Sequence, residues 1–153
     1  MTSDYENIYS CFLSKITDYS FLSLPEDDIY DFMRGWMHST TARPYIRRLF
    51  SSIQLDDEIQ LLTFELTDPV DDDSDLDFTV EILARGMVIA WLEPQVKSVI
   101  NISQMFGGKE QKFYAQANHL NELKGLLKEA KTELRKMIRD HGYINNSYLR
   151  GDE

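Results

Sequence analysis

The sequence predicts a mainly α-helical protein: a helical bundle with a long C-terminal helix, a small β-hairpin and an extended C-terminal tail. Three observations lead to this fold class. The chain has 153 residues, the usual size of one domain. Apolar residues recur at steps of three and four through most of it, as on the buried face of amphipathic helices. Only the segment 45–66 carries the alternation that is typical of an exposed strand.

Two helices are expected in the N-terminal part. The first spans about residues 3–17, and its apolar stripe consists of Tyr5, Ile8, Tyr9, Phe12, Leu13 and Ile16. The second spans about residues 24–42, where Ser23, Pro25 and an acidic first turn are typical of a helix start. It should end before Pro44, because the residue that precedes a proline avoids the helical region.

Residues 45–66 are rich in Ile, Leu and Phe, and Asp56 and Asp57 divide them. Partial alternation over residues 58–61 favours a β-hairpin. The turn signal is weak, because no glycine follows the two aspartates. A short helix at 45–52 followed by a loop is the alternative.

Residues 68–77 form an acidic segment with the sequence DPVDDDSDLD. Because so many like charges cannot pack together, we expect an exposed loop. We also expect it to bind no metal, since an EF-hand loop needs a glycine and a glutamate where this segment has Leu76 and Ile82. The acidic residues concerned are Asp71, Asp72, Asp73, Asp75 and Asp77.

Two more helices should follow. The first, about residues 78–92, is apolar on nearly all sides, which indicates a central helix that Pro94 ends or kinks. The second, about residues 110–141, would be on the order of 45 Å long. This exceeds what a compact domain needs, so part of it should meet another chain. We expect the core to contain Trp36, Leu83, Val88, Trp91, Leu120 and Leu127.

Gly142 suits the end of that helix, so residues 1–142 should form the helical domain and residues 143–153 a tail. The tail is too short to form a core of its own. Aromatic side chains such as it contains anchor protein interfaces. We therefore expect it to dock on a partner, with a tail folded back on its own helix as the alternative; the docking residues are Tyr143, Ile144, Tyr148 and Leu149.

The charge distribution bears on the choice of partner. The formal net charge of −10 divides into −13 for residues 1–93 and +3 for residues 94–153. An acidic chain is a poor candidate for gripping nucleic acid, which requires clustered Lys and Arg. The opposite signs of the two parts could guide self-association, although solvated faces would also explain them. No apolar run approaches the length of a membrane span.

The sequence shows no catalytic apparatus. His38, His119 and His141 form no paired-ligand motif, and the glycine motifs of phosphate binding and of nucleophile elbows are absent. Cys11 has no basic neighbour closer than Lys15, so a low-pKa nucleophile is not expected. We expect neither enzymatic activity nor a cofactor or metal, which leaves a structural assembly component or a protein-binding adaptor.

Two segments carry a resemblance to a known family. GMVIAWLEPQV (86–96) and FYAQANHLNELKGLLKEAKTELRKMIRDHGY (113–143) are similar to small proteins encoded among the virion structural genes of tailed bacteriophages. These are the head–tail connector, or adaptor, proteins of the neck. The resemblance covers about residues 80–143. The N-terminal helices agree in layout more than in letters, and residues 69–77 look like an insertion.

The resemblance implies a helical subunit that forms a ring, a dodecamer, beneath the portal protein of the capsid. Such a ring extends the channel through which the genomic DNA leaves and provides the docking surface for the next neck, stopper or tail protein. It implies a virion protein made in the host cytoplasm, with no membrane contact. The portal would then be the partner of the tail, and the acidic segment would face the lumen or a neighbouring subunit. The alternative is a cytoplasmic helical adaptor or regulatory protein.

Overall fold

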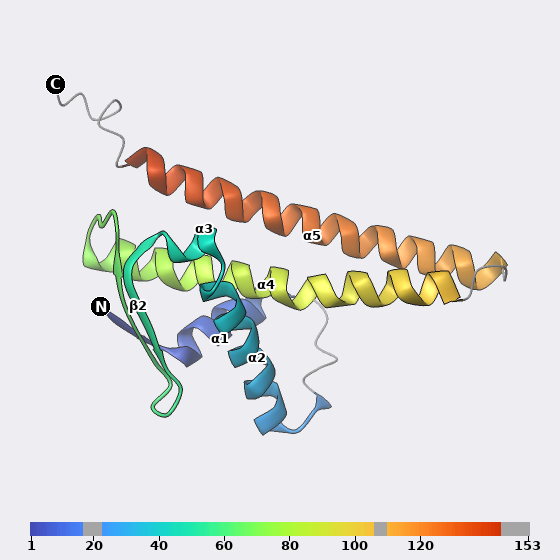
Figure 1. The fold of residues 1–153 in the computed structure, drawn as a ribbon, viewed down its shortest axis with the longest axis horizontal. Helices are drawn as coiled ribbons and strands as arrows, with labels where there is room; N and C mark the ends of the chain where they lie inside the picture. Colours follow the sequence, from blue (N-terminus) through green and yellow to red (C-terminus); the bar gives the residue numbers. More distant parts are fainter. Residues whose placement is uncertain (17–22, 106–109, 145–153) are drawn as a thin grey trace.

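The computed structural model describes residues 1–16, 23–105 and 110–144. Within them the chain forms five helices and three strands. The two longest helices, α4 (Asp72–Met105) and α5 (Glu110–Ile144), run side by side in opposite directions (Figure 1). The other elements pack along the first half of α4. The predicted fold class, mainly helical with a long C-terminal helix, is confirmed.

The two predicted N-terminal helices are present with shorter ends. They are α1 (Tyr5–Lys15), which begins after the N-cap residue Asp4, and α2 (Glu26–Thr41), which begins after Pro25. The apolar stripe of α1 is buried against α4, as its spacing predicts. The first turn of α2 is acidic, which is favourable because carboxylates near a helix N-terminus interact with the helix dipole.

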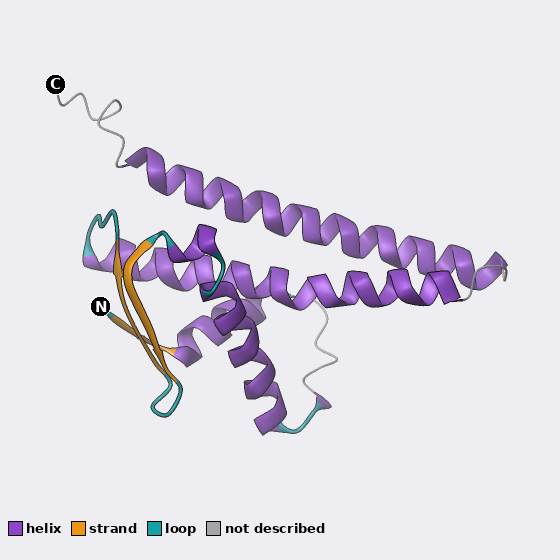
Figure 2. Ribbon diagram, in the orientation of Figure 1, coloured by secondary structure: helices purple, strands orange, loops and turns teal. Residues whose placement is uncertain are grey.

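The hairpin predicted within residues 45–66 is confirmed, as strands β2 (Phe50–Asp56) and β3 (Leu61–Leu66). The alternative for this segment is also partly correct, because a short helix, α3 (Pro44–Arg47), precedes the hairpin. A strand that was not predicted, β1 (Thr2–Asp4), pairs with β3 and completes an antiparallel sheet of order β1-β3-β2 (Figure 2).

The hairpin turn forms without glycine. The side chain of Asp56 accepts hydrogen bonds at its Oδ1 from the backbone N–H groups of Glu58 (3.1 Å) and Ile59 (3.4 Å). Gln60 takes the one positive φ that the turn needs, 54°. Local bonding of an aspartate side chain to the backbone therefore replaces the glycine signal that the sequence lacks.

The main core lies between α1, α2, the sheet and the first half of α4. Of the six residues expected there, Leu83 is fully buried and the other five are half-buried. Trp36, Val88, Trp91 and Leu127 pack around the rim, whereas Leu120 packs in a separate small cluster between α4 and α5. The reason is that α1 and the sheet fill the centre, so that Phe12 lies 5.5 Å from the ring of Trp36 and 6.4 Å from that of Trp91. The largest fully buried side chains include Tyr5, Ile8, Phe12, Met37, Ile46, Leu62, Phe64, Ile82 and Met87.

Helices α2 and α4 approach each other closely at Gly86. A Cβ atom built at this position would lie 2.1 Å from Cγ2 of Thr40 in α2. Carbon atoms in contact are normally separated by about 3.5–4.0 Å, so a larger residue does not fit without movement. Gly86 therefore fixes the distance between the two helices.

The helix predicted over residues 78–92 extends further at both ends than expected. Helix α4 begins at Asp72 and continues through Pro94 to Met105, so Pro94 does not end it. A proline removes one backbone hydrogen bond from a helix interior. Leu92 and Val96, on either side of Pro94, pack against Leu123 of α5, and this contact stabilises the helix across the proline.

The expectation that Gly142 ends the last helix is wrong. Helix α5 includes Gly142 and reaches Ile144. Gly142 does not take a positive φ, and a Cβ atom at this position would meet nothing within 4 Å among the described residues. The glycine is thus compatible with a helix end but does not impose one.

Candidate functional site

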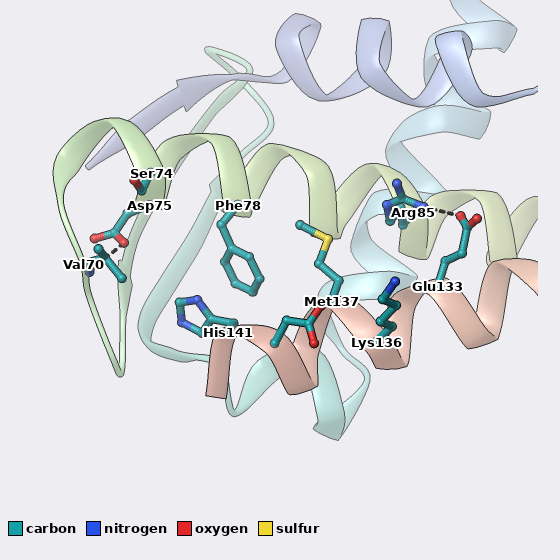
Figure 3. A pocket seen from close by; sticks show the side chains of 10 residues that line it. Val70, Ser74, Asp75, Phe78, Arg85, Glu133, Lys136, Met137 and His141 are labelled. Carbon is teal, nitrogen blue, oxygen red and sulfur yellow. Dashed lines mark hydrogen bonds and ion pairs between the residues drawn. The ribbon is translucent and has the colours of Figure 1, made fainter. Parts of the chain in front are cut away.

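The start of α4 and the end of α5 enclose a groove of about 480 Å³, here called the end groove. Val70, Asp75 and Phe78 line it on one side and Lys136, Met137 and His141 on the other (Figure 3). The first side belongs to the predicted acidic segment and the helix that follows it. The second side leads into the predicted docking tail. The structure therefore brings the acidic segment and the first two predicted docking residues, Tyr143 and Ile144, to the same end of the molecule.

His141 forms part of the wall of the end groove. Its ring stacks on Phe78, with the ring centroids 4.1 Å apart and an angle of 13° between the planes. The side chain is only 8% exposed, and its Nε2 atom has no hydrogen-bond partner among the described residues. Arg85 and Glu133 form an ion pair between α4 and α5 further along the groove (Figure 3). These contacts hold the end of α5 against α4.

The acidic segment is not the exposed loop that the sequence predicts, because α4 begins inside it at Asp72. Asp75 is buried, and its Oδ1 accepts a hydrogen bond from the backbone N–H of Val70 at 2.9 Å. Asp71 accepts one from the N–H of Ser74 at 2.7 Å, which lowers the pKa of the Asp71 carboxyl. The first N–H groups of a helix lack partners within it, so carboxylates are favourable at this position.

The other acidic residues of the segment, Asp72, Asp73 and Asp77, are exposed, as expected. They lie on the first turns of α4 rather than on a loop. Their carboxylates remain available to a partner at this end of the molecule. The preceding residues, from Asp68 to Asp71, are exposed and stand outside the helix.

The predicted docking residues fall into two groups. Tyr143 and Ile144 belong to the last turn of α5. Tyr148 and Leu149 lie outside the described residues. Helix α5 therefore includes the first two of the predicted docking residues and ends beside the end groove.

A network of polar side chains links α1 to α4 around Cys11. Its thiol donates a hydrogen bond to Glu81 (3.1 Å), which also accepts one from Lys15 (2.6 Å) and pairs with Arg85 (3.0 Å). Burial and the hydrogen bond to Glu81 raise the pKa of Cys11 to about 11. Burial alone would raise the pKa of Glu81. The hydrogen bonds from Lys15 and Cys11 lower it by more, so the pKa of Glu81 lies below its ordinary value. A protonated, hydrogen-bonded thiol of this kind is a structural group and not a nucleophile.

A second network anchors the hairpin turn. Asp57 accepts a hydrogen bond from the Tyr5 hydroxyl at 2.7 Å, and its carboxylate lies 2.9 Å from Nε2 of His38. The bond from Tyr5, followed by that from His38, lowers the pKa of Asp57. His119, the third histidine, is exposed on α5. Two of the three histidines, His38 and His141, thus have structural contacts.

The described residues contain no group of three or more His, Cys, Asp or Glu side chains placed to hold a metal ion. In the same part of the chain, no helix combines the length and the apolar character needed to cross a membrane.

A second surface, here called the basic groove, was not predicted from the sequence. It has a volume of about 470 Å³ and lies between the α3 region and α5. Arg43, Lys131, Arg135 and Arg139 surround it, and Ile89, Leu134 and Ile138 form its apolar floor. A signal for it exists in the sequence, because basic residues recur at 128, 131, 135 and 139, on one face of α5. The contribution of Arg43 comes from a distant segment and needs the fold.

No family model matches the sequence, and the comparisons with curated proteins and with solved structures give no match. Any assignment of function therefore depends on the sequence and on the surfaces described above, namely the end groove with its acidic rim, the start of the tail, and the basic groove.

Proposed function

We propose that the protein is a structural subunit of the neck of a tailed bacteriophage, a head–tail connector that forms a ring beneath the portal. In this role it extends the DNA channel and provides the docking surface for the next neck or tail protein. It acts by binding other proteins and carries no catalytic activity. It is made in the host cytoplasm and becomes part of the virion.

The observation that carries this proposal is that the two ends of the α4–α5 pair have different surroundings. At one end, α1, α2 and the sheet cover α4, and α5 ends there (Figure 1). Towards the other end, Leu92 and Val96 of α4 pack against residues of α5 in a separate small core. The segment that resembles connector proteins, residues 80–143, is nearly this entire helix pair. A subunit with two distinct ends suits a protein that bridges two different partners.

The electrostatics support the same role. The part of the chain up to residue 93 carries a net charge of −13, and exposed carboxylates lie at the start of α2 and at the start of α4. A channel wall that repels phosphate does not trap passing DNA, whereas clustered Lys and Arg would bind it. An acidic surface towards the channel is therefore compatible with DNA passage.

Deletion of residues 145–153 tests the portal contact, because it removes the tail and leaves α5 whole. We expect the shortened protein to unfold at the same temperature as the parent but to fail to join heads that contain the portal. The double variant Tyr148→Ala/Leu149→Ala should behave like the deletion, since these side chains anchor the contact. The variant Asn145→Ala/Asn146→Ala is the matched control and should assemble normally.

The experiment measures how many subunits purify with the heads. Normal occupancy of the shortened protein would exclude the tail as the anchor. Absence of the parent protein from purified virions would exclude the connector role itself and favour the cytoplasmic adaptor.

A further inference from the structure

The basic groove is built to receive an acidic segment that also carries apolar side chains. Its floor residues Ile89 and Leu134 are 1% and 2% exposed, so they are fixed by the core. No acidic side chain lines the groove among the described residues. Glu93, beside the groove, pairs with Arg43 at 3.0 Å and with Lys131 at 3.6 Å. Arg139 pairs with Asp140 at 3.8 Å. Two carboxylates beside four basic groups leave a net positive rim around an apolar floor, on a chain whose net charge is −10.

A surface with the opposite properties lies at the start of α2, here called the acidic-aromatic face. It contains the carboxylates of Asp27, Asp28 and Asp31, of which Asp31 pairs with Arg34. The side chains of Leu24, Tyr30 and Phe32 flank them, with Tyr30 on the side that packs on Tyr9. The exposed fractions of these three apolar side chains are 41%, 37% and 49%. Large apolar side chains exposed together, with charges around them, mark protein interaction sites.

Phe32 is the most exposed aromatic residue of this face. It stacks on Trp36, with ring centroids 5.9 Å apart, so its position is fixed. It lies one helical turn from both Asp28 and Gly35. A Cβ atom at Gly35 would meet nothing within 4 Å among the described residues, so there is open space beside the ring. Phe32 can therefore act as an anchor without rearrangement, and this limits the entropy cost of binding.

The two surfaces lie on opposite sides of the subunit. Helix α5 runs along one side of α4, whereas the start of α2 projects away from the other side (Figure 1). They therefore do not meet within one copy. A chain that carries two different complementary surfaces forms head-to-tail contacts with further copies, and such contacts close into rings when the geometry permits.

We propose that the acidic-aromatic face of one copy docks into the basic groove of the next copy. Phe32 covers the accessible part of the floor, which Ile138 provides. The carboxylates of α2 pair with the basic rim. This inference deepens the proposed ring by naming its two subunit faces, and it is tested on the purified protein alone, so that its failure leaves the connector role standing.

Zero-length coupling with a carbodiimide tests the contact directly, because it joins an ammonium group to a carboxylate only when the two touch. A mixture of unlabelled and ¹⁵N-labelled protein at low salt distinguishes links between copies from links within one copy. We expect a mixed-isotope link between Lys131 and Asp27, Asp28 or Asp31, and less of it as salt is added. If Lys131 forms no such link with these aspartates, the proposal is wrong.

Charge reversal provides a second test. The variants Arg135→Glu/Arg139→Glu (groove-reversed) and Asp27→Lys/Asp28→Lys (face-reversed) should each lose the contact, with dimers and larger species reduced about tenfold or more, because like charges then meet. All four side chains are exposed in the single subunit, so the substitutions should leave its fold unchanged. The melting curve of each variant checks this.

Mixing the two variants makes the test specific. In the mixture, each reversed surface meets an oppositely charged partner, so association should return with the two proteins alternating. The control Lys97→Glu/Lys124→Glu changes the net charge as the groove-reversed variant does, at exposed sites outside both grooves, and should associate like the parent. Undiminished association of either reversed variant, or no recovery in the mixture, would overturn the proposal.

Discussion

Replacement of Gly86 by alanine should destabilise the protein, although alanine is the better helix former. The added Cβ atom would lie 2.1 Å from Cγ2 and 3.1 Å from Oγ1 of Thr40. Relief requires a movement of about 1.5 Å, or rotation of the Thr40 side chain away from its hydrogen bond to the Trp36 carbonyl (2.8 Å). Overpacking costs about 1–3 kcal/mol and the lost hydrogen bond about 1 kcal/mol. The gain in helix propensity returns about 1 kcal/mol, which leaves a net loss of about 1–3 kcal/mol.

Urea and thermal unfolding, followed by circular dichroism, measure this effect. For a chain of this size each kcal/mol lowers Tm by about 2–4 °C. Gly125→Ala is the matched control, since Gly125 is also inside a long helix but a Cβ atom there meets nothing within 4 Å among the described residues. It should raise the stability by up to about 1 kcal/mol. The same substitution should thus act with opposite signs at the two positions.

A second substitution identifies the cause. Thr40→Ala removes the two closest atoms and leaves Cβ of residue 40 at 3.2 Å, so Gly86→Ala should cost less in a Thr40→Ala background. If Gly86→Ala is as stable as the parent, or if its cost is independent of Thr40, α2 and α4 do not cross as closely as described.

Three further predictions concern the polar groups. The folded-state pKa of Glu81 is lowered, so its contribution to stability is present above the unfolded pKa of about 4.3 and is lost as the pH falls through the folded pKa. Urea titrations should therefore show a stability difference between parent and Glu81→Gln that shrinks below about pH 4; a constant difference would contradict this. Cys11 should react slowly with iodoacetamide at pH 8 in the folded protein and quickly in urea, because burial raises its pKa to about 11; equal rates would show that the thiol is accessible. Calcium should leave Tm unchanged, because Asp71 and Asp75 already bond to backbone N–H groups; a rise of several degrees that Asp71→Asn/Asp72→Asn/Asp73→Asn abolishes would show a site.

The helices could be predicted because their signals are local. The stripe from Tyr5 to Ile16 and the acidic first turn of α2 each lie within one element, so the sequence shows them directly. Strand β1 could not be found in this way. Its three residues pair with Leu61, Leu62 and Thr63, and no local pattern points to a partner that far along the chain.

The start of α4 was misjudged because two effects of the aspartates compete. Their mutual repulsion favours a loop, whereas the free N–H groups and the dipole of a helix start favour carboxylates. The helix prevails here because Asp71 and Asp75 bond to backbone N–H groups. That Pro94 does not end the helix could not be predicted for a related reason, since the packing of Leu92 and Val96 on α5 is a tertiary effect. The spacing of the basic residues on α5 could have predicted part of the basic groove. The contribution of Arg43 could not be predicted, because it comes from a distant segment.

The pairing of β1 with β3 has a consequence for how the protein is made. Residues Thr2 to Asp4 have no strand partner until residues 61–63 have been synthesised. At ordinary rates of translation this takes on the order of several seconds. The nitrogen of Met1, which donates to the carbonyl of Phe64 at 2.9 Å, likewise lacks its acceptor until residue 64 has been synthesised. Strand β1 is thus made well before its partner and can join the edge of the sheet only late.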